Sequence, residues 1–231
     1  MMINHGAEID KLNRLNLDKL NFGCGPNPLP GWVNIDGGDG KVWTAPSAAE
    51  IVKLDAFDAV RRIPEGSARF IFSEQFFEHF DRPTAIQLLK EWYRILKPGG
   101  VVRIQTPDLE KEVLMYLDKL EGVSWEKDVK PRRIRQLGES KESYCKLEAN
   151  ENYTPAILLN NGMHLDGHLF LYDFETLAQS LRVAGFQSIL KVEFGKSTHQ
   201  ELSGINLHDG GDSGRHWIPK VVLEVEAQKP F

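Results

Sequence analysis

The sequence predicts an α/β protein with a mostly parallel sheet that is covered on both faces. Short apolar runs with strand character recur along the chain, and segments with helical spacing lie between them. This alternation is typical of parallel sheets, because parallel neighbours need long crossover connections. The length of 231 residues fits one domain over residues 1–231, within which residues 108–172 form an insertion.

The first expected strand begins at Lys19 and ends in the small residues Gly23 to Gly25. Glycine allows the backbone conformations that a tight turn needs, and a proline-rich stretch follows at once. A second strand is expected at Val33 to Asp36. Only Pro26 to Trp32 lie between the glycine turn and this strand, so the connection must be a short turn.

Five further strands complete the predicted sheet, and two clear helices are expected between strands. The first helix follows a start signal at Asp81 to Pro83 and ends before Lys97 to Gly100. The second has Asp173 as its N-cap and Gly185 at its C-terminal cap position. The further strands are expected at Ile51–Asp55, Arg69–Ser73, Gly100–Thr106, Ser188–Val192 and Val221–Glu226.

Two stretches interrupt the alternation of strands and helices, Asp108 to Tyr172 and Gly195 to Pro219. A structureless loop as long as the first would be rare, so we expect helices within it, the clearest at Leu109 to Leu120. Because this insertion follows the fifth expected strand, it is placed to cover a bound ligand as a substrate cap.

Composition excludes several classes of protein. A net charge of -5 with 26% charged residues excludes a strongly basic nucleic-acid wrapper and a chain too charged to collapse. The two cysteines, Cys24 and Cys145, indicate neither a disulfide scaffold nor a zinc site. The N-terminus lacks the order of a signal peptide, and no stretch approaches the roughly 18 apolar residues of a membrane span. We therefore expect a cytoplasmic protein without membrane insertion, and we do not expect nucleic acid as its partner.

Residues just past the strands mark the expected ligand site, because parallel sheets bind ligands at the carboxyl ends of their strands. The turn at Gly23 to Gly25 would let a ligand approach the backbone, and Asp36 and Asp55 offer carboxylate oxygens to hydroxyl groups. Together they predict a nucleoside-binding edge. Each also has a purely structural interpretation: the glycines as turn formers, the aspartates as turn acids, and Cys24 as a small packed side chain.

Five segments have the order and spacing of a known family, although none is specific by itself. They are Leu20–Gly25, Val33–Asp36, Leu54–Ala56, Phe72–His79 and Arg94–Gly100. Together they resemble the class I S-adenosylmethionine-dependent methyltransferases over about Leu20 to Phe194. Within that class, Gly23–Asp36 and His168–Phe174 look like a bacterial group of predicted methyltransferases often linked to cell-surface glycan synthesis. The short connection after the first strand departs from the class, most of whose members have a full helix there.

The resemblance implies a Rossmann-like, doubly wound, seven-stranded sheet whose last strand is antiparallel. It also implies S-adenosylmethionine as the cofactor, held by residues at the strand ends. These are Gly23, Cys24 and Gly25 for the amino-acid part, Asp36 for the ribose, Asp55 and Ala56 for adenine, and Ser73 and Glu74 for the methyl side.

The expected reaction is O-methylation of a small-molecule or saccharide acceptor. Transfer from a sulfonium mainly needs alignment and exclusion of water, so no metal is required. A neutral imidazole could take the proton of the acceptor hydroxyl, with His168 as the first candidate and His79 as the second. Alternatively, both histidines only pack or cap. The spacing of His164 and His168 also allows a metal pair, but the flanking Gly162 and Gly167 favour a loop.

Two other functions stay open. The chain could bind the adenosyl cofactor or a partner protein without catalysis. An NAD-dependent oxidoreductase would need a third glycine at a helix start, where this chain has Pro28. For the acceptor, aromatic and basic residues of the insertion could stack on a sugar or hold a phosphate. These are Trp125, Arg132, Arg133, Tyr144 and Tyr153.

Overall fold

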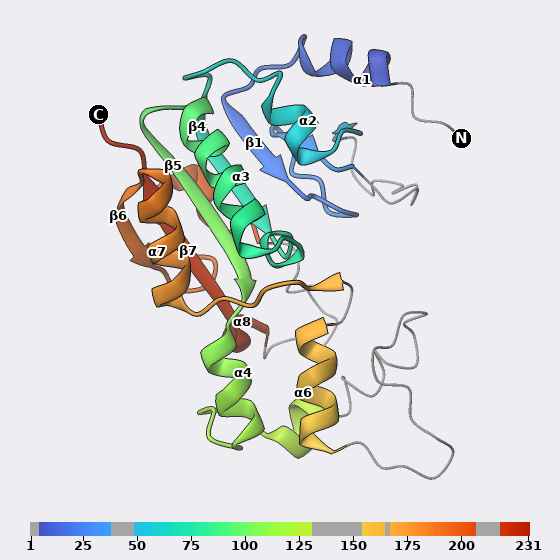
Figure 1. The fold of residues 1–231 in the computed structure, drawn as a ribbon, viewed down its shortest axis with the longest axis vertical. Coiled ribbons are helices and arrows are strands. Elements are labelled where there is room, and N and C mark those ends of the chain that lie inside the picture. Colours follow the sequence, from blue (N-terminus) through green and yellow to red (C-terminus); the bar gives the residue numbers. More distant parts are fainter. Residues whose placement is uncertain (1–4, 38–48, 131–153, 165–166, 207–217) are drawn as a thin grey trace.

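A computed structural model describes residues 5–37, 49–130, 154–164, 167–206 and 218–231 (Figure 1). Its centre is a seven-stranded sheet with the strand order β3-β2-β1-β4-β5-β7-β6. Among the described strands, only β7 runs against its neighbours, pairing antiparallel with both β5 and β6. The predicted class is therefore confirmed, including the antiparallel last strand.

The strands lie close to the predicted segments. They are β1 (Lys19–Phe22), β2 (Val33–Ile35), β3 (Ile51–Val52), β4 (Ala68–Glu74), β5 (Leu96–Pro107), β6 (Gln187–Lys191) and β7 (Val222–Gln228). The main difference is the start of β5, which begins at Leu96 rather than at Gly100. Leu96 already pairs with Ala68, and the register then shifts before Phe70 pairs with Val101. The Lys97–Gly100 turn thus lies within an irregular strand instead of before it.

The two predicted helices, α3 (Arg82–Ile95) and α7 (Phe174–Ala184), lie on one face of the sheet (Figure 1). The Asp81 carboxylate accepts a hydrogen bond from the Thr84 amide at 2.8 Å and begins α3. Asp173 begins α7 in the same way, and Gly185 ends it with a φ of 107°. The apolar sides of α3 and α7 pack against the sheet and form part of the core.

Two shorter helices were not predicted. α1 (His5–Leu12) precedes the sheet, and α2 (Ala56–Val60) follows β3. α2 has only five residues, too few for the repeating apolar spacing that identifies a helix in a sequence. Its N-cap is Asp55, which accepts hydrogen bonds from the amides of Phe57 and Asp58.

The opposite face of the sheet is covered differently. Phe70 and Val101 pack there against Leu202 of the short 3-10 helix η4 (Gln200–Leu202), with Trp32 and Ile205 alongside. Described residues between β6 and β7 therefore cover part of this face.

The insertion after β5 lies at the carboxyl end of the parallel strands, as Figure 1 shows. Asp108 and Tyr172 form a parallel bridge, so the two ends of the insertion meet. Its described helices are α4 (Leu109–Tyr116), a π-helical turn η2 (Trp125–Val129) and α6 (Pro155–His164). The short helix α8 (Ile218–Val221) leads into β7 beside them. α4 confirms the helix predicted at Leu109, although it ends at Tyr116 instead of Leu120. Within the described ranges, no helix combines the length and hydropathy needed to cross a membrane.

Candidate functional site

The glycine turn and Asp36 meet at the carboxyl ends of β1 and β2. Gly23 and Gly25 have φ angles of 69° and 50°, in the left-handed region that favours glycine. The Gly23 amide donates to the Ile35 carbonyl at 2.9 Å. The Gly25 amide donates to the Asp36 carboxylate at 2.7 Å. The glycine turn and Asp36, which the sequence assigns to one ligand, are thus in direct contact.

Gly23 also makes room for a neighbouring ring. A Cβ atom built on Gly23 would lie 2.2 Å from the Phe76 ring, whereas one built on Gly25 would meet nothing within 4 Å. Close packing and a positive φ therefore coincide at Gly23, and only the second applies at Gly25.

We expect Gly23→Ala to lower the free energy of unfolding by about 2–5 kcal/mol, since a left-handed alanine costs about 1–2 kcal/mol and an overpacked contact about 1–3 kcal/mol. Gly25→Ala is the matched control and should lose only about 1–2 kcal/mol, because it carries the backbone strain alone. Urea denaturation of both variants measures the difference. Equal losses would contradict the role assigned to Phe76.

A buried asparagine holds the short connection between β1 and β2. The Asn34 Oδ1 atom accepts hydrogen bonds from the Leu29 amide at 2.7 Å and the Asn21 side chain at 3.0 Å. Its Nδ2 atom donates to the carbonyls of Leu29 and Trp32. One side chain thus fixes the turn without a helix. Sequence reasoning missed it, although an asparagine inside a buried strand was a usable signal.

Cys24 lies in the glycine turn and is buried. Burial, reinforced by the Asp36 charge, raises the pKa of its thiol to about 12. The thiol is therefore protonated at neutral pH and is not a nucleophile. It lines a small cavity at the carboxyl ends of β1 and β4. The other lining residues are Asn21, Gly23, Asn27, Leu29, Phe72 and Glu74.

Asp55 and Ala56 lie where α2 begins, and Asp55 is occupied as its N-cap. Asp55 therefore has a structural role as a helix cap, where the structural interpretation of the sequence had placed a turn acid. Beside it, Phe57, Phe76 and Phe80 form an aromatic cluster, with the Phe80 ring centroid 6.1 Å from Phe57 and 5.0 Å from Phe76. No local pattern in the sequence distinguishes these rings from its other aromatic residues.

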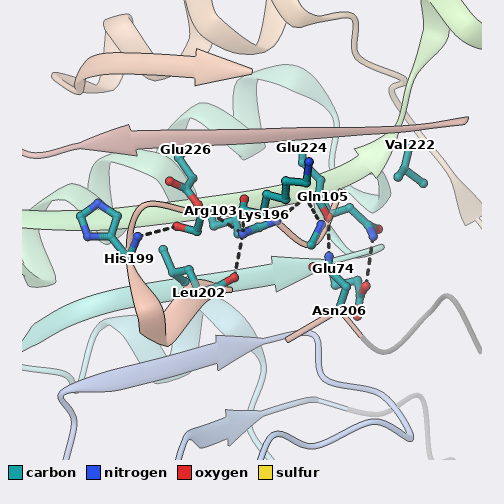
Figure 2. Close-up of polar contacts among 12 residues, drawn as sticks. Glu74, Arg103, Gln105, Lys196, His199, Leu202, Asn206, Val222, Glu224 and Glu226 are labelled. Carbon is teal, nitrogen blue, oxygen red and sulfur yellow. Dashed lines mark hydrogen bonds and ion pairs between the residues drawn. The ribbon is translucent and has the colours of Figure 1, made fainter. Parts of the chain in front are cut away.

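Ser73 and Glu74 end β4 in the interior. Ser73 Oγ has no hydrogen-bond partner in the described part of the chain and is fully buried. Glu74 accepts a hydrogen bond from the Gln105 side chain at 3.0 Å, and Gln105 accepts one from Gln75 at 2.7 Å. Gln105 in turn pairs with Glu224 across β5 and β7. Glu74 is thus the first member of a polar row that crosses the sheet (Figure 2).

Arg103 lies at the centre of this polar face and is fully buried (Figure 2). Its guanidinium contacts the carboxylates of Glu224 and Glu226. It also donates to the carbonyls of Leu202 at 2.7 Å and Lys196 at 3.1 Å. The network therefore ties the segment between β6 and β7 to the sheet beside the cavity.

The two histidines selected from the sequence come together with Glu78. The rings of His79 and His168 pack edge to face with centroids 5.0 Å apart. His168 Nε2 lies 3.9 Å from Glu78 Oε1, and Thr106 Oγ1 donates to Glu78 Oε2 at 3.0 Å. Burial raises the pKa of Glu78 to about 7. His164 is the last residue of α6, which also contains Gly162, so the loop expected around Gly162 is a helix there.

Several candidates for the acceptor site lie outside the described residues. They are Arg132, Arg133, Tyr144 and Tyr153. Trp125 lies in η2, where its side chain is not described.

Comparisons with known proteins agree with this fold. Residues 35–104 match the family model of a methyltransferase domain, Methyltransf_11, and this match includes Asp36, Asp55, Ser73, Glu74 and the Glu78–His79 pair. Among curated proteins, no sequence matches the chain.

Two solved structures share the architecture. An S-adenosylmethionine-dependent methyltransferase from Archaeoglobus fulgidus is 16% identical with a TM-score of 0.51, and the match covers 98% of this chain and 95% of that chain. Phosphoethanolamine N-methyltransferase 2 from Haemonchus contortus, solved with S-adenosyl-L-methionine, is 14% identical with a TM-score of 0.50, covering 98% and 52%. At these identities the likeness concerns the fold. The domain match and the fold together support the class I S-adenosylmethionine-dependent methyltransferase superfamily.

Proposed function

We propose that this chain is an S-adenosylmethionine-dependent methyltransferase that O-methylates a small-molecule or saccharide hydroxyl. The observation that carries the proposal is the 2.7 Å contact between the Gly25 amide and the Asp36 carboxylate. This contact joins the glycine turn to an acid at the end of the adjacent strand. Asp36 lies within the segment that matches the methyltransferase domain, and the whole fold is like that of a solved methyltransferase. A carboxylate accepts several hydrogen bonds at once, so Asp36 can bind ribose hydroxyls while it holds the turn.

The structure argues against a nicotinamide dinucleotide. A dinucleotide fold places the pyrophosphate at the N-terminus of the helix after the first strand. Here residues 23–32, all described, contain no helix, and the turn is held by Asn34 instead. A sulfonium cofactor has no pyrophosphate and does not need that helix.

The cofactor would supply an activated methyl group on a positively charged sulfur. The residues that we assign to it surround the carboxyl ends of β1, β2, β3 and β4. We assign Gly23, Cys24 and Gly25 to its amino-acid part, Asp36 to the ribose, Asp55 and Ala56 to the adenine edge, and Ser73 and Glu74 to the methyl side. The aromatic cluster of Phe57, Phe76 and Phe80 would provide an apolar wall for the adenine ring.

Calorimetric titration tests the cofactor assignment. We expect binding of S-adenosylmethionine and S-adenosylhomocysteine but not of NAD. Binding of NAD alone would overturn the proposal. Binding of the adenosyl compounds without transfer to any acceptor of a cell extract would favour the non-catalytic alternative.

His168 is the proposed base. Its Nδ1 atom lies 3.1 Å from the Gly162 carbonyl, which can only accept a hydrogen bond, so Nδ1 carries the proton and Nε2 keeps its lone pair. Nε2 would take the proton of the acceptor hydroxyl, while the cofactor would supply the methyl group and retain the electron pair of its carbon–sulfur bond. The Glu78 carboxylate would stabilise the resulting imidazolium. His79, packed against His168, is the second candidate.

We expect His168→Ala to lower kcat by about 100-fold or more, the usual contribution of a general base. The affinity for S-adenosylmethionine should not change, because His168 is not among the residues assigned to the cofactor. Steady-state kinetics and calorimetry of the same preparation separate the two effects, and His79→Ala in parallel tests the second candidate. Unchanged turnover in His168→Ala would remove it as the base.

The acceptor is proposed to be a saccharide or a sugar-linked metabolite, following the resemblance to the bacterial group linked to surface glycans. Incubating the protein with a labelled methyl donor and a cell extract identifies the product. A labelled nucleic acid or protein instead of a saccharide would contradict this acceptor.

A further inference from the structure

We propose that Glu78, His79 and His168 form a binding site for a divalent transition-metal ion. One nitrogen of each imidazole and one oxygen of Glu78 all lie within 4.8 Å of one another. Ligands at about 2.0–2.2 Å from an ion are at most about 4 Å apart. A small inward movement of the three side chains would therefore complete the site.

The orientation of His168 matches that of a metal ligand. Metal-binding histidines almost always donate their second ring N–H to a carbonyl or carboxylate. The Gly162 carbonyl fills this role for Nδ1 at 3.1 Å. Nε2 is then left with a lone pair that faces Glu78 Oε1, which is also an electron-pair donor when ionised.

Glu78 points to the same conclusion. Its side chain is fully buried, and Oε1 has no hydrogen-bond partner within the described residues. The 3.9 Å between Oε1 and His168 Nε2 is too long for a hydrogen bond. The other oxygen accepts a hydrogen bond from Thr106 at 3.0 Å, and carboxylates that bind metals are commonly oriented by such hydrogen bonds. Two electron-pair donors whose atoms face each other at 3.9 Å leave a position suited to a cation.

The donor set indicates the class of ion. Two imidazoles and one carboxylate suit Zn²⁺, Co²⁺, Ni²⁺ or Fe²⁺. Mg²⁺ and Ca²⁺ prefer oxygen ligands throughout. Zinc or a chemically similar dication is therefore the proposed ligand. Spacing along the chain does not group these three residues, because Glu78 and His79 follow β4 whereas His168 lies at the far end of the insertion.

An ion at this site would affect methyl transfer, an inference that rests on the proposed function. A metal bound to His168 Nε2 uses the lone pair that the acceptor proton needs. The ion and the base role exclude each other, so metal binding would inhibit methyl transfer.

Cobalt titration tests the site. The full chain without a polyhistidine tag is treated with a chelator, dialysed and titrated with Co²⁺, whose visible absorption reports nitrogen and oxygen ligands. We expect one Co²⁺ per chain, displaced by Zn²⁺. His79→Ala and His168→Ala should each weaken binding by at least about 10–100-fold. Thr106→Val should weaken it by about 10-fold, because the hydrogen bond that orients Glu78 is lost. His5→Ala changes an exposed histidine of α1 that lies beside Asp58, and this control variant should bind Co²⁺ normally.

The outcomes separate the two proposals. Absence of binding in the wild-type chain, or normal binding in both His79→Ala and His168→Ala with intact circular dichroism, would overturn the site. The second measurement is methyl transfer during the same titration, where we expect turnover to fall in step with occupancy. Occupancy without inhibition would leave the metal site standing and would refute His168 as the base.

Discussion

Replacing Asp36 with Ala should weaken S-adenosylmethionine binding by about 100-fold or more. Hydrogen bonds to a charged group contribute about 1.5–3 kcal/mol each, and two ribose hydroxyls would lose their acceptor together. The Gly25 amide would also lose its partner at 2.7 Å, which loosens the turn on the amino-acid side of the cofactor. Calorimetric titration of the variant measures the loss directly.

Two controls make this result specific. Asp36→Asn keeps one oxygen that can accept from Gly25 but removes the charge, so it should bind with intermediate affinity. Asp58→Ala removes an exposed carboxylate from neighbouring α2 and should bind like the wild type. Wild-type affinity in Asp36→Ala would refute the ribose assignment, and equal weakening in all three variants would point to a general electrostatic effect instead.

Local signals were sufficient to predict most of the fold. The caps Asp81, Asp173 and Gly185 act over three or four residues, and all three are found where the sequence places them. The strands were recognisable because buried parallel strands are continuous apolar runs. α2 was missed because five residues show no periodicity.

The candidate site was less predictable, because its contacts join distant segments. Gly25 and Asp36 could be paired from the order of the strands, since adjacent parallel strands end together. The approach of His168 to Glu78 depends on how the insertion returns to the sheet, which no local pattern encodes. The same holds for Phe76 against Gly23, which the sequence shows only as one aromatic residue among several.

The polar face beneath the site had a partial sequence signal. Glu224 and Glu226 alternate with apolar residues along β7, and alternation normally predicts a solvent-exposed face. In the structure that face is buried, because the chain between β6 and β7 folds over it and Arg103 neutralises part of the charge. The charged residues of this strand are thus buried as a network because a segment that follows β6 covers them.

Arg103→Met should lower the free energy of unfolding by about 3–5 kcal/mol, the usual effect of removing one partner from a buried ion pair. Glu224 and Glu226 would stay buried without their cation, and the carbonyls of Leu202 and Lys196 would lose their donor. Urea denaturation at neutral pH measures the loss. Adding Glu224→Gln and Glu226→Gln to this variant should recover part of it, since no unpaired charge then remains.

The pH dependence of the stability lost in Arg103→Met tests whether this loss is electrostatic. Burial already raises the pKa of Glu224 in the wild type, although Arg103 acts to lower it. Without Arg103 the folded-state pKa should rise further above the unfolded value, so the folded variant binds more protons than the unfolded chain. Its stability relative to the wild type should therefore improve as the pH falls through that pKa and be poorest above it. We expect the deficit to be smaller at about pH 5.5 than at about pH 8. An equal deficit at both pH values would show that the loss comes from packing and not from the two uncompensated carboxylates.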